Sequence, residues 1–285
     1  MDGENTIMAS IGRRISRQRT KVDGPGVRTL VAFTGCPLRC KLCINKDLTG
    51  PDANGEIMTP EELFEVLKID DIYFRASGGG ITFDGGEPLL HADFIKRFRE
   101  FCPPEWNIAV ETSLNVPLEN VSLLKDVVDL WIVDVKDMNP EIYLTYTEQP
   151  IDNMLANLNY LVHQGLQERI RARVPHIPGF NTQEDVDESL KGLKSMGIKT
   201  DEFFYVENML DDDNPTTGLI ASDDNVRGKR YFRWPIILGW IIGIVAGVAC
   251  GFFASTILAR ILASIVVAII TGLITYVVVG DIIED

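Results

Sequence analysis

Short β-rich runs alternate with helical patterns over the first 206 residues, and this alternation constrains the fold more than any other feature of the chain. Consecutive strands that are joined through a helix pair in parallel, with the helix outside the sheet. Six such units predict an α/β domain, either an open barrel or a wound sheet, and their spacing does not choose between the two. The expected strands are Arg28–Thr34, Gly80–Phe83, Asn107–Glu111, Leu130–Val135, Ile170–Val174 and Glu202–Val206.

Helical patterns occupy the intervals between these runs. Thr59 precedes Pro60 and two glutamates, the pattern of an N-cap followed by proline at the first helical position. The other expected helices are His91–Phe101, Pro117–Val127, Ile151–Gln164 and Gln183–Met196.

The end of the chain has a different composition. Residues 235–254 are 20 consecutive uncharged, mostly apolar positions, and residues 261–279 are 19 more. As a helix, each run spans the ~30 Å hydrocarbon core of a bilayer. We therefore predict a transmembrane helical hairpin over residues 234–280. An acidic-then-basic linker, residues 209–233, would join it to a domain over residues 1–208; the alternative is a buried helical hairpin in a soluble protein.

The net charge also differs between the two parts of the chain. The chain has 27 basic and 41 acidic residues, and residues 227–285 hold five of the basic and three of the acidic ones. The remainder, with 22 basic and 38 acidic residues, has a net charge of −16, which argues against sequence-independent nucleic-acid binding. Four basic residues precede the first apolar run, and the N-terminus lacks a signal-peptide pattern. We expect a multi-pass protein of the cytoplasmic membrane whose large domain faces the cytoplasm.

Three cysteines, Cys36, Cys40 and Cys43, lie within eight residues directly after the first expected strand. Thiolates suit iron–sulfur clusters or zinc, but a structural zinc site needs four ligands. The other two cysteines, Cys102 and Cys250, and the three histidines form no second ligand pair. Three thiolates on a four-iron cluster would leave one iron open to another ligand.

Two glycine-rich segments flank this motif in the chain. Asp23-Gly24-Pro25-Gly26-Val27-Arg28 leads into the first strand, and residues 77–88 read SGGGITFDGGEP across the second. Glycines at such positions let a ligand approach the backbone. An ordinary turn is the alternative for the first segment and a bend is the alternative for the second.

Together these motifs resemble the radical S-adenosylmethionine superfamily. The C-x3-C-x2-C spacing and the Gly-Gly-Glu-Pro run at residues 85–88 carry the resemblance, which covers roughly residues 10–208. The Asp23–Arg28 run, Gly-Gly-Gly-Ile-Thr at residues 78–82 and Asp134-Val135-Lys136 narrow it to the activating enzymes of glycyl-radical enzymes, of the pyruvate formate-lyase activase kind. The resemblance implies a partial (β/α)6 barrel; the predicted membrane hairpin lies outside it.

The resemblance also implies a chemistry. In the family, three cysteines hold a [4Fe–4S] cluster whose fourth iron is chelated by S-adenosylmethionine, and one electron cleaves this cofactor to a 5′-deoxyadenosyl radical that takes a hydrogen atom. Cys36, Cys40 and Cys43 match the cluster ligands. The matching cofactor positions are Leu42, Ile44, Gly85, Gly86, Glu87, Asp134, Val135, Lys136 and Arg173. Asp23, Gly24, Pro25 and Gly26 would seat the glycine loop of a protein substrate.

Some positions depart from the family or have simpler interpretations. Glu111-Thr112 stands where relatives have Asp-Thr and bind a monovalent cation, and Leu42 stands where they have an aromatic residue. Relatives carry a histidine near the end of the sixth strand, where this chain reads Phe204-Tyr205-Val206-Glu207-Asn208. Asp134 and Lys136 could instead face solvent, and Arg173 could form a structural ion pair.

The resulting prediction is a membrane-tethered radical S-adenosylmethionine oxidoreductase that removes hydrogen from a glycine of a glycyl-radical enzyme. A flavodoxin or ferredoxin-type donor would dock on the basic residues Arg13, Arg14, Arg17, Arg19 and Lys21. Two alternatives stay open: radical modification of another peptide or a small molecule, and a non-catalytic iron–sulfur membrane scaffold or sensor.

Overall fold

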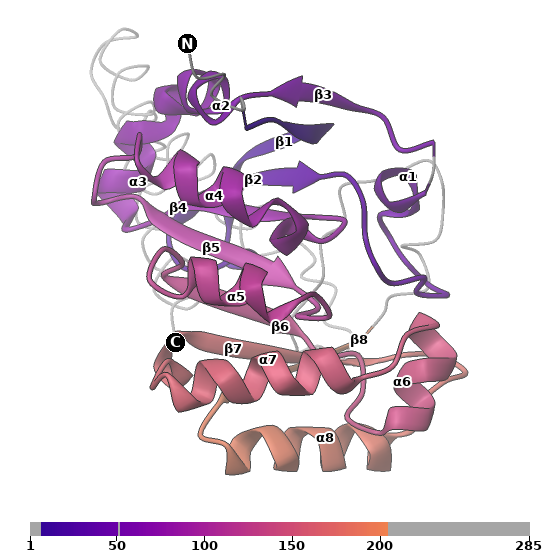
Figure 1. Ribbon diagram of the computed structural model, residues 1–285. Coiled ribbons are helices and arrows are strands. Elements are labelled where there is room, and N and C mark those ends of the chain that lie inside the picture. Colours follow the sequence, from indigo (N-terminus) through magenta and orange to yellow (C-terminus); the bar gives the residue numbers. More distant parts are fainter. Residues whose placement is uncertain (1–6, 51, 205–285) are drawn as a thin grey trace, which may run out of the picture. The chain divides into compact units, whose positions relative to one another are not determined.

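The computed structural model describes residues 7–50 and 52–204, which form one eight-stranded sheet in the order β3-β1-β2-β4-β5-β6-β7-β8 (Figure 1). From β2 to β8, the strands pair in parallel and follow one another in chain order. An order without reversal is that of a barrel and not of a doubly wound sheet. Since β3 and β8 end the sheet, the barrel is partial. The parallel strands are β2 (Val27–Phe33), β4 (Gly80–Gly85), β5 (Asn107–Thr112), β6 (Leu130–Asp134), β7 (Ile170–His176) and β8 (Lys199–Phe204).

These six strands correspond to the six predicted from the sequence, although β8 begins three residues before the predicted start at Glu202 and residues 205–206 lie outside the described residues. Two further strands were not predicted. β1 (Ala9–Thr20) pairs antiparallel with β2, and β3 (Gly55–Met58) pairs antiparallel with β1 at the edge of the sheet. β1 carries the basic run, whose arginines interrupt the apolar alternation of a strand, and β3 has four residues. A short strand such as β3 is typical of a sheet edge, where it discourages pairing with other chains.

Eight α-helices are described, and five of them were predicted. Thr59 caps α2, and its reciprocal hydrogen bonds with Glu62 form a capping box. The short helices α1, α3 and α6 were not expected. The helices are α1 (Lys46–Thr49), α2 (Pro60–Leu67), α3 (Asp71–Ser77), α4 (Ala92–Arg99), α5 (Leu118–Leu124), α6 (Pro140–Thr147), α7 (Asp152–His163) and α8 (Gln183–Ser195), and the 3-10 turns are Lys68–Asp70, Pro88–His91 and Gln167–Arg169.

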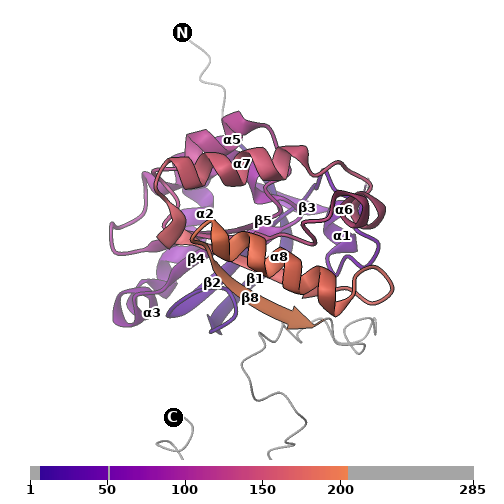
Figure 2. The same ribbon diagram turned by 90° about the horizontal axis from the view of Figure 1, so that it is seen from below.

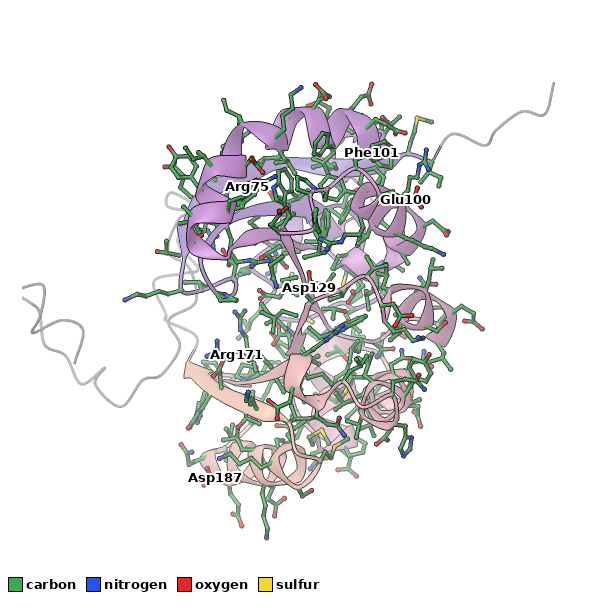
Figure 3. The ribbon with its side chains drawn as sticks, turned by 90° about the vertical axis from the view of Figure 1, so that its left-hand side faces the viewer. Arg75, Glu100, Phe101, Asp129, Arg171 and Asp187 are labelled. Carbon is green, nitrogen blue, oxygen red and sulfur yellow. The ribbon has the colours of Figure 1, made fainter. Side chains whose placement is uncertain are left out.

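The apolar core lies between the outer face of the sheet and the helices that cover it (Figures 1 and 2). Side chains alternate between the two faces of a strand, so Ile81 and Phe83 of β4 enter this core. The neighbouring strands present to the same core Val31, Phe33, Ile108, Val110, Trp131, Val133, Ala172 and Val174. Exposed charged residues such as Asp187 of α8 extend away from it (Figure 3).

The inner face of the sheet carries polar residues at the alternate positions. Thr82 and Asp84 of β4 lie between Ile81, Phe83 and Gly85 in sequence, and the parallel register places Asp84 beside Ala32 of β2. The other polar residues on this face are Arg28, Asn107, Glu111, Asp134 and Arg173. The inner face is therefore where the fold gathers chemical groups.

Among the described residues, no helix combines the length and the apolar character needed to cross a bilayer. The predicted spans at residues 235–254 and 261–279, and the linker at 209–233, lie outside the described residues.

Two glycines should respond oppositely to alanine. A Cβ atom on Gly80 would lie 2.0 Å from the carbonyl oxygen of Asn107, whereas a Cβ on Gly192 in α8 would meet nothing within 4 Å. We expect Gly80→Ala to lower the free energy of unfolding by about 2–3 kcal/mol, because β4 and β5 must separate. Gly192→Ala should raise it by about 0.5–1 kcal/mol, because alanine reduces the entropy of the unfolded chain and favours the helix. Urea unfolding monitored by circular dichroism measures both; equal effects would contradict the packing described here.

Candidate active site

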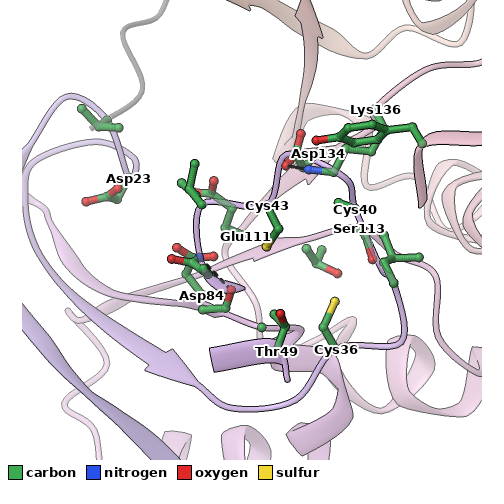
Figure 4. A pocket seen from close by; sticks show the side chains of 18 of the residues that line it. Asp23, Cys36, Cys40, Cys43, Thr49, Asp84, Glu111, Ser113, Asp134 and Lys136 are labelled. Atoms are coloured by element: carbon green, nitrogen blue, oxygen red, sulfur yellow. Dashed lines mark hydrogen bonds and ion pairs between the residues drawn. The ribbon is translucent and has the colours of Figure 1, made fainter. Parts of the chain in front are cut away.

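A pocket lies at the carboxyl ends of the parallel strands, where barrels of this kind place their functional groups (Figure 4). Asp84–Gly86 after β4, Glu111–Ser113 after β5 and Asp134 at the end of β6 line it. The loop that follows β2 contributes Cys36, Cys40 and Cys43, so the three sequence motifs meet at one site. In Figure 4, Cys36 and Cys40 lie on the side of the pocket opposite Asp23 and Asp84.

The cysteine loop, residues 34–45, is held by backbone hydrogen bonds from two directions. Gly35 N donates to Leu48 O at 2.8 Å on the α1 side. On the other side, Arg39 N donates to Thr147 O at 2.9 Å and Lys41 N to Tyr146 O at 3.1 Å, so the loop rests on the end of α6. This unpredicted helix therefore supports the loop that carries the thiols.

The three thiols are half-buried, and burial raises the pKa of Cys36 to about 12 and that of Cys40 to about 11. Metal ligation reverses such a shift, because a coordinating thiol loses its proton. Within the described part of the chain, no three His, Cys, Asp or Glu side chains are arranged to hold a single metal ion. A cluster that takes one thiolate per iron fits three thiols spread around a pocket better than a mononuclear site does.

The Gly85-Gly86 turn lies directly against the cysteine loop. A Cβ on Gly86 would lie 1.9 Å from Gly35 O, and Gly85 has a φ of +105° that favours glycine. Asn45 Nδ2 donates to Gly85 O at 2.8 Å and ties the turn to the same loop. The close approach that these glycines permit is thus to protein backbone, although both residues also line the pocket.

Glu87, the third residue of this motif, turns away from the pocket. Its side chain is 1% exposed, and it accepts hydrogen bonds from Thr112 Oγ1 at 2.6 Å, Ser113 N at 2.9 Å and Ser113 Oγ at 2.6 Å. The carboxylate fastens the β4 turn to the end of β5. Thr112 belongs to the Glu111-Thr112 pair that stands where relatives bind a monovalent cation, and its hydroxyl donates to Glu87.

Asp134 and Lys136 both line the pocket and pair with each other, so they do not face bulk solvent. Their side chains are 20% and 12% exposed. The second carboxylate oxygen, Asp134 Oδ1, is buried and has no hydrogen-bond partner among the described residues. Val135 between them points into the apolar core. Asp134 Oδ1 is therefore an acceptor available to a ligand in the pocket.

Carboxylates dominate the other side of the pocket. Burial, reinforced by the neighbouring charge of Glu111, raises the pKa of Asp84 to about 8. Glu111 accepts a hydrogen bond from Arg173 Nη1 at 2.6 Å, and Asp23 pairs with Arg19. Arg173 is thus the partner of a pocket carboxylate, as the ion-pair interpretation of the sequence stated.

Asp84 and Arg19 line the pocket but were not predicted as site residues. Asp84 follows Thr82 by two positions in β4, so a polar alternation inside an apolar strand was the available signal. Arg19 was predicted only as part of the basic run for donor docking, because its proximity to the pocket depends on how β1 folds back along β2.

Of the remaining predicted site residues, some line the pocket and others do not. Ile44 lines it, whereas Leu42, Gly24, Pro25 and Gly26 do not. Of the segment Phe204–Asn208, residues 205–208 lie outside the described part of the chain. The described histidine at the end of the neighbouring strand β7, His176, does not line the pocket and contacts Glu202 at 2.5 Å.

The site fits an iron–sulfur cluster with a small polar cofactor. Three thiols line the pocket, and Asp134, whose buried Oδ1 has no hydrogen-bond partner among the described residues, lines it as well. Glycines at the ends of β2 and β4 bring the two loops together without side chains between them. Soft thiolates for iron and a buried carboxylate for a cationic group are the donor set that such a pair requires.

Comparison with known proteins agrees with this geometry. The model of the Radical SAM superfamily matches residues 30–193. The chain is 30% identical over 220 residues to the (2S)-3-sulfopropanediol dehydratase activating enzyme of Klebsiella oxytoca, covering 56% of this chain and 69% of that protein. It is 32% identical over 187 residues to the pyruvate formate-lyase 1-activating enzyme of Escherichia coli K12, covering 62% of this chain and 73% of that enzyme.

A solved structure supports the fold. The crystal structure of Streptococcus suis SuiB bound to S-adenosylmethionine superposes with a TM-score of 0.51 at 13% sequence identity. The match covers 61% of this chain and 39% of SuiB, and at this identity it shows the fold alone.

The cysteines give a direct test of the site. Replacing Cys36, Cys40 or Cys43 by alanine should abolish cluster binding, because each thiol lines the pocket and a cubane needs one ligand per iron. Cys102 is the matched control: it is also half-buried, but its thiol donates to Phe98 O, outside the pocket. Iron content and visible absorbance after anaerobic reconstitution measure the result. Full iron loading in a Cys40→Ala variant, or loss of iron in Cys102→Ala, would contradict this assignment.

Proposed function

Because the chain belongs to the Radical SAM superfamily, we propose that it activates a glycyl-radical enzyme by removing a hydrogen atom from a glycine of that protein. The chain is a radical S-adenosylmethionine enzyme related to glycyl-radical-enzyme activating enzymes, and such enzymes use a [4Fe–4S] cluster and S-adenosylmethionine. The observation that carries the proposal is the meeting of the cysteine loop and Asp23 on one pocket.

The residues on the cysteine side would hold the cofactors. Cys36, Cys40 and Cys43 would bind three irons, while Asp134 and Lys136 would bind polar groups of S-adenosylmethionine beside the Gly85-Gly86 turn. When bound, these groups supply reductive cleavage to methionine and a 5′-deoxyadenosyl radical, which takes a glycine hydrogen to give 5′-deoxyadenosine and a glycyl radical.

The residues on the carboxylate side would seat the protein substrate. A peptide entering the pocket presents backbone N–H groups, and the carboxylate of Asp23 lies at the pocket wall. Both of its oxygens accept from Arg19, and each keeps a further lone pair for a substrate N–H. Leu38, Ile44 and Tyr146 add apolar surface to the same pocket. The two aliphatic side chains and the tyrosine ring would help to exclude water from the reacting groups.

Deuterium transfer tests this function. Pyruvate formate-lyase and (2S)-3-sulfopropanediol dehydratase, after which two relatives are named, are prepared with deuterated glycine and incubated anaerobically with the reconstituted full chain, S-adenosylmethionine and dithionite. We expect 5′-deoxyadenosine that carries one deuterium and a glycyl-radical signal in the electron paramagnetic resonance spectrum. The Cys36→Ala variant is the control, because it should form neither product.

The other outcomes separate the alternatives. Formation of 5′-deoxyadenosine without deuterium would contradict glycine abstraction and favour another peptide or small-molecule substrate. A fully reduced cluster that forms no 5′-deoxyadenosine would favour a sensor or scaffold.

An acidic flavodoxin or ferredoxin-type protein is the electron donor that we propose. Exposed Arg39 on the cysteine loop and Lys46 on α1 place positive charge beside the thiols, whereas Lys41 pairs with Glu148. Complementary charge speeds the encounter of redox partners. The basic run in β1 is a weaker candidate than the sequence indicated, because Arg17 pairs with Asp70 and Arg19 with Asp23.

Membrane attachment is a separate proposal that rests on the sequence alone. The apolar runs 235–254 and 261–279 and the basic residues before them support a multi-pass anchor with the catalytic domain in the cytoplasm. In this arrangement the glycyl-radical enzyme and its donor would meet the chain at the inner face of the membrane.

Carbonate extraction of membranes tests the anchor. The full chain should stay in the pellet, whereas a Val245→Lys, Ile270→Lys double variant should move to the supernatant, because a charge at the centre of a span costs about 2.5–3.5 kcal/mol. Protease added to inverted vesicles should digest the large domain and leave it intact in right-side-out vesicles. Extraction of the wild-type chain into the supernatant would contradict attachment.

A further inference from the structure

Arg28 is a fully buried cation whose hydrogen bonds all go to uncharged groups. Nε donates to Thr82 Oγ1 at 2.6 Å; Nη2 donates to Ile81 O at 2.6 Å and Asn107 O at 3.1 Å. Nη1 donates to Asn107 Oδ1 at 3.0 Å and Pro25 O at 3.3 Å. These bonds use all five N–H donors of the guanidinium. No carboxylate within the described residues forms an ion pair with it, so its place in the barrel depends on these acceptors.

Thr82 connects Arg28 to the loop that precedes β2. The threonine is fully buried, and its hydroxyl accepts from Arg28 Nε while donating to Asp23 O at 2.7 Å. Arg28 also reaches Pro25 O directly. Two carbonyl oxygens of the loop are therefore held from inside the barrel.

The same loop, residues 22–27, is fixed at two more points. A Cβ on Gly26 would lie 2.5 Å from Gly79 N, and a Cβ on Gly79 would lie 1.9 Å from Val27 O, so the two glycine-rich segments of the sequence interlock. Arg173 Nη2 donates to Val22 O while its Nη1 holds Glu111. All these contacts involve the backbone of the loop, and the Asp23 side chain lines the pocket, where it pairs with Arg19.

We propose that Arg28 and Thr82 are positioning residues that fix the 22–27 loop, so that Asp23 faces the substrate. This inference rests on the proposed function, in which that loop seats the glycine loop of the partner protein. It assigns a role to the Gly-Gly-Gly-Ile-Thr run as well, since this run holds the substrate-seating loop and does not line the pocket. The competing interpretation is that Arg28 and Thr82 merely fill the interior of the barrel.

Thr82→Val tests the proposal, because valine keeps the shape of threonine but leaves Asp23 O and Arg28 Nε unpaired. Thr82→Ser restores the hydroxyl. Thr29→Val is the matched control: Thr29 is also fully buried in a strand and donates to Asp70 at 2.9 Å, but the structure gives it no bond to the loop. Arg28→Lys removes the planar set of guanidinium N–H donors while keeping the positive charge.

The first measurement is hydrogen exchange of the 22–27 segment in the full-length, cluster-reconstituted chain. Loss of at least two buried hydrogen bonds in each of Thr82→Val and Arg28→Lys should speed amide exchange there about tenfold. Exchange in Thr82→Ser and Thr29→Val should stay within about twofold of wild type. Equal exchange in Thr82→Val and Thr29→Val would overturn the proposal.

The second measurement separates positioning from general destabilisation. With pyruvate formate-lyase or (2S)-3-sulfopropanediol dehydratase as the protein probe, Thr82→Val should lower kcat/KM for glycyl-radical formation about tenfold. The affinity for S-adenosylmethionine and the rate of 5′-deoxyadenosine formation without protein should stay unchanged, because the bonds that are lost lie away from the cysteine side of the pocket. A looser loop with unchanged kcat/KM would also overturn the proposal.

The experiments test the proposed function and the role of Arg28 and Thr82 independently. If the wild-type chain forms no glycyl radical on either probe, the proposed function fails, whereas hydrogen exchange still decides whether Thr82 and Arg28 hold the loop. If the wild-type chain is active and Thr82→Ser behaves like Thr82→Val, the hydroxyl relay is wrong while the function stands.

Discussion

Burial of the outer face of the parallel sheet under its helices is the interaction on which the rest of the structure depends. Most of the alternate residues of β2 to β7 that enter this layer are apolar, and these form one continuous core with the helices. Because side chains alternate, the inner face needs no apolar residues for stability at its carboxyl end. That freedom lets Thr82, Asp84, Glu111, Asp134 and Arg173 occupy one surface without weakening the core.

Glycines at the two ends of β4 allow close backbone contact with the cysteine loop and with the 22–27 loop. Gly86 lies against the backbone of Gly35 in the cysteine loop, and Gly79 lies against the backbone of Val27 at the end of the 22–27 loop. In each pair a side chain would force the segments apart. The two motifs at either end of β4 thus position two different loops, one with the thiols and one with Asp23. A single strand thereby sets the relation between the cofactor side and the substrate side of the pocket.

The charges of the pocket follow from the same arrangement. Thiols gather where the loop after β2 rests on α6, and carboxylates gather where β4, β5 and the 22–27 loop converge (Figure 4). Arg19 and Arg173 each neutralise one carboxylate, and Arg173 also holds the backbone of Val22. The basic run that looked like a uniform donor-docking patch is divided by these pairings, because Arg17 and Arg19 are engaged with acidic residues of the barrel.

The amino-acid sequence by itself determined the six parallel strands, the capped start of α2 and the cysteine and glycine motifs, because periodicity, caps and ligand spacing are local properties. It also supplied the family resemblance and the two apolar runs near the end of the chain. Only the tertiary structure decided that the order of the strands is that of a barrel, that Glu87 fastens β5, and that Asp84 and Arg19 line the pocket. It likewise decided the relay from Arg28 through Thr82 to Asp23. These features join residues up to 59 positions apart through hydrogen bonds, and such contacts exist only once the strands have been placed side by side.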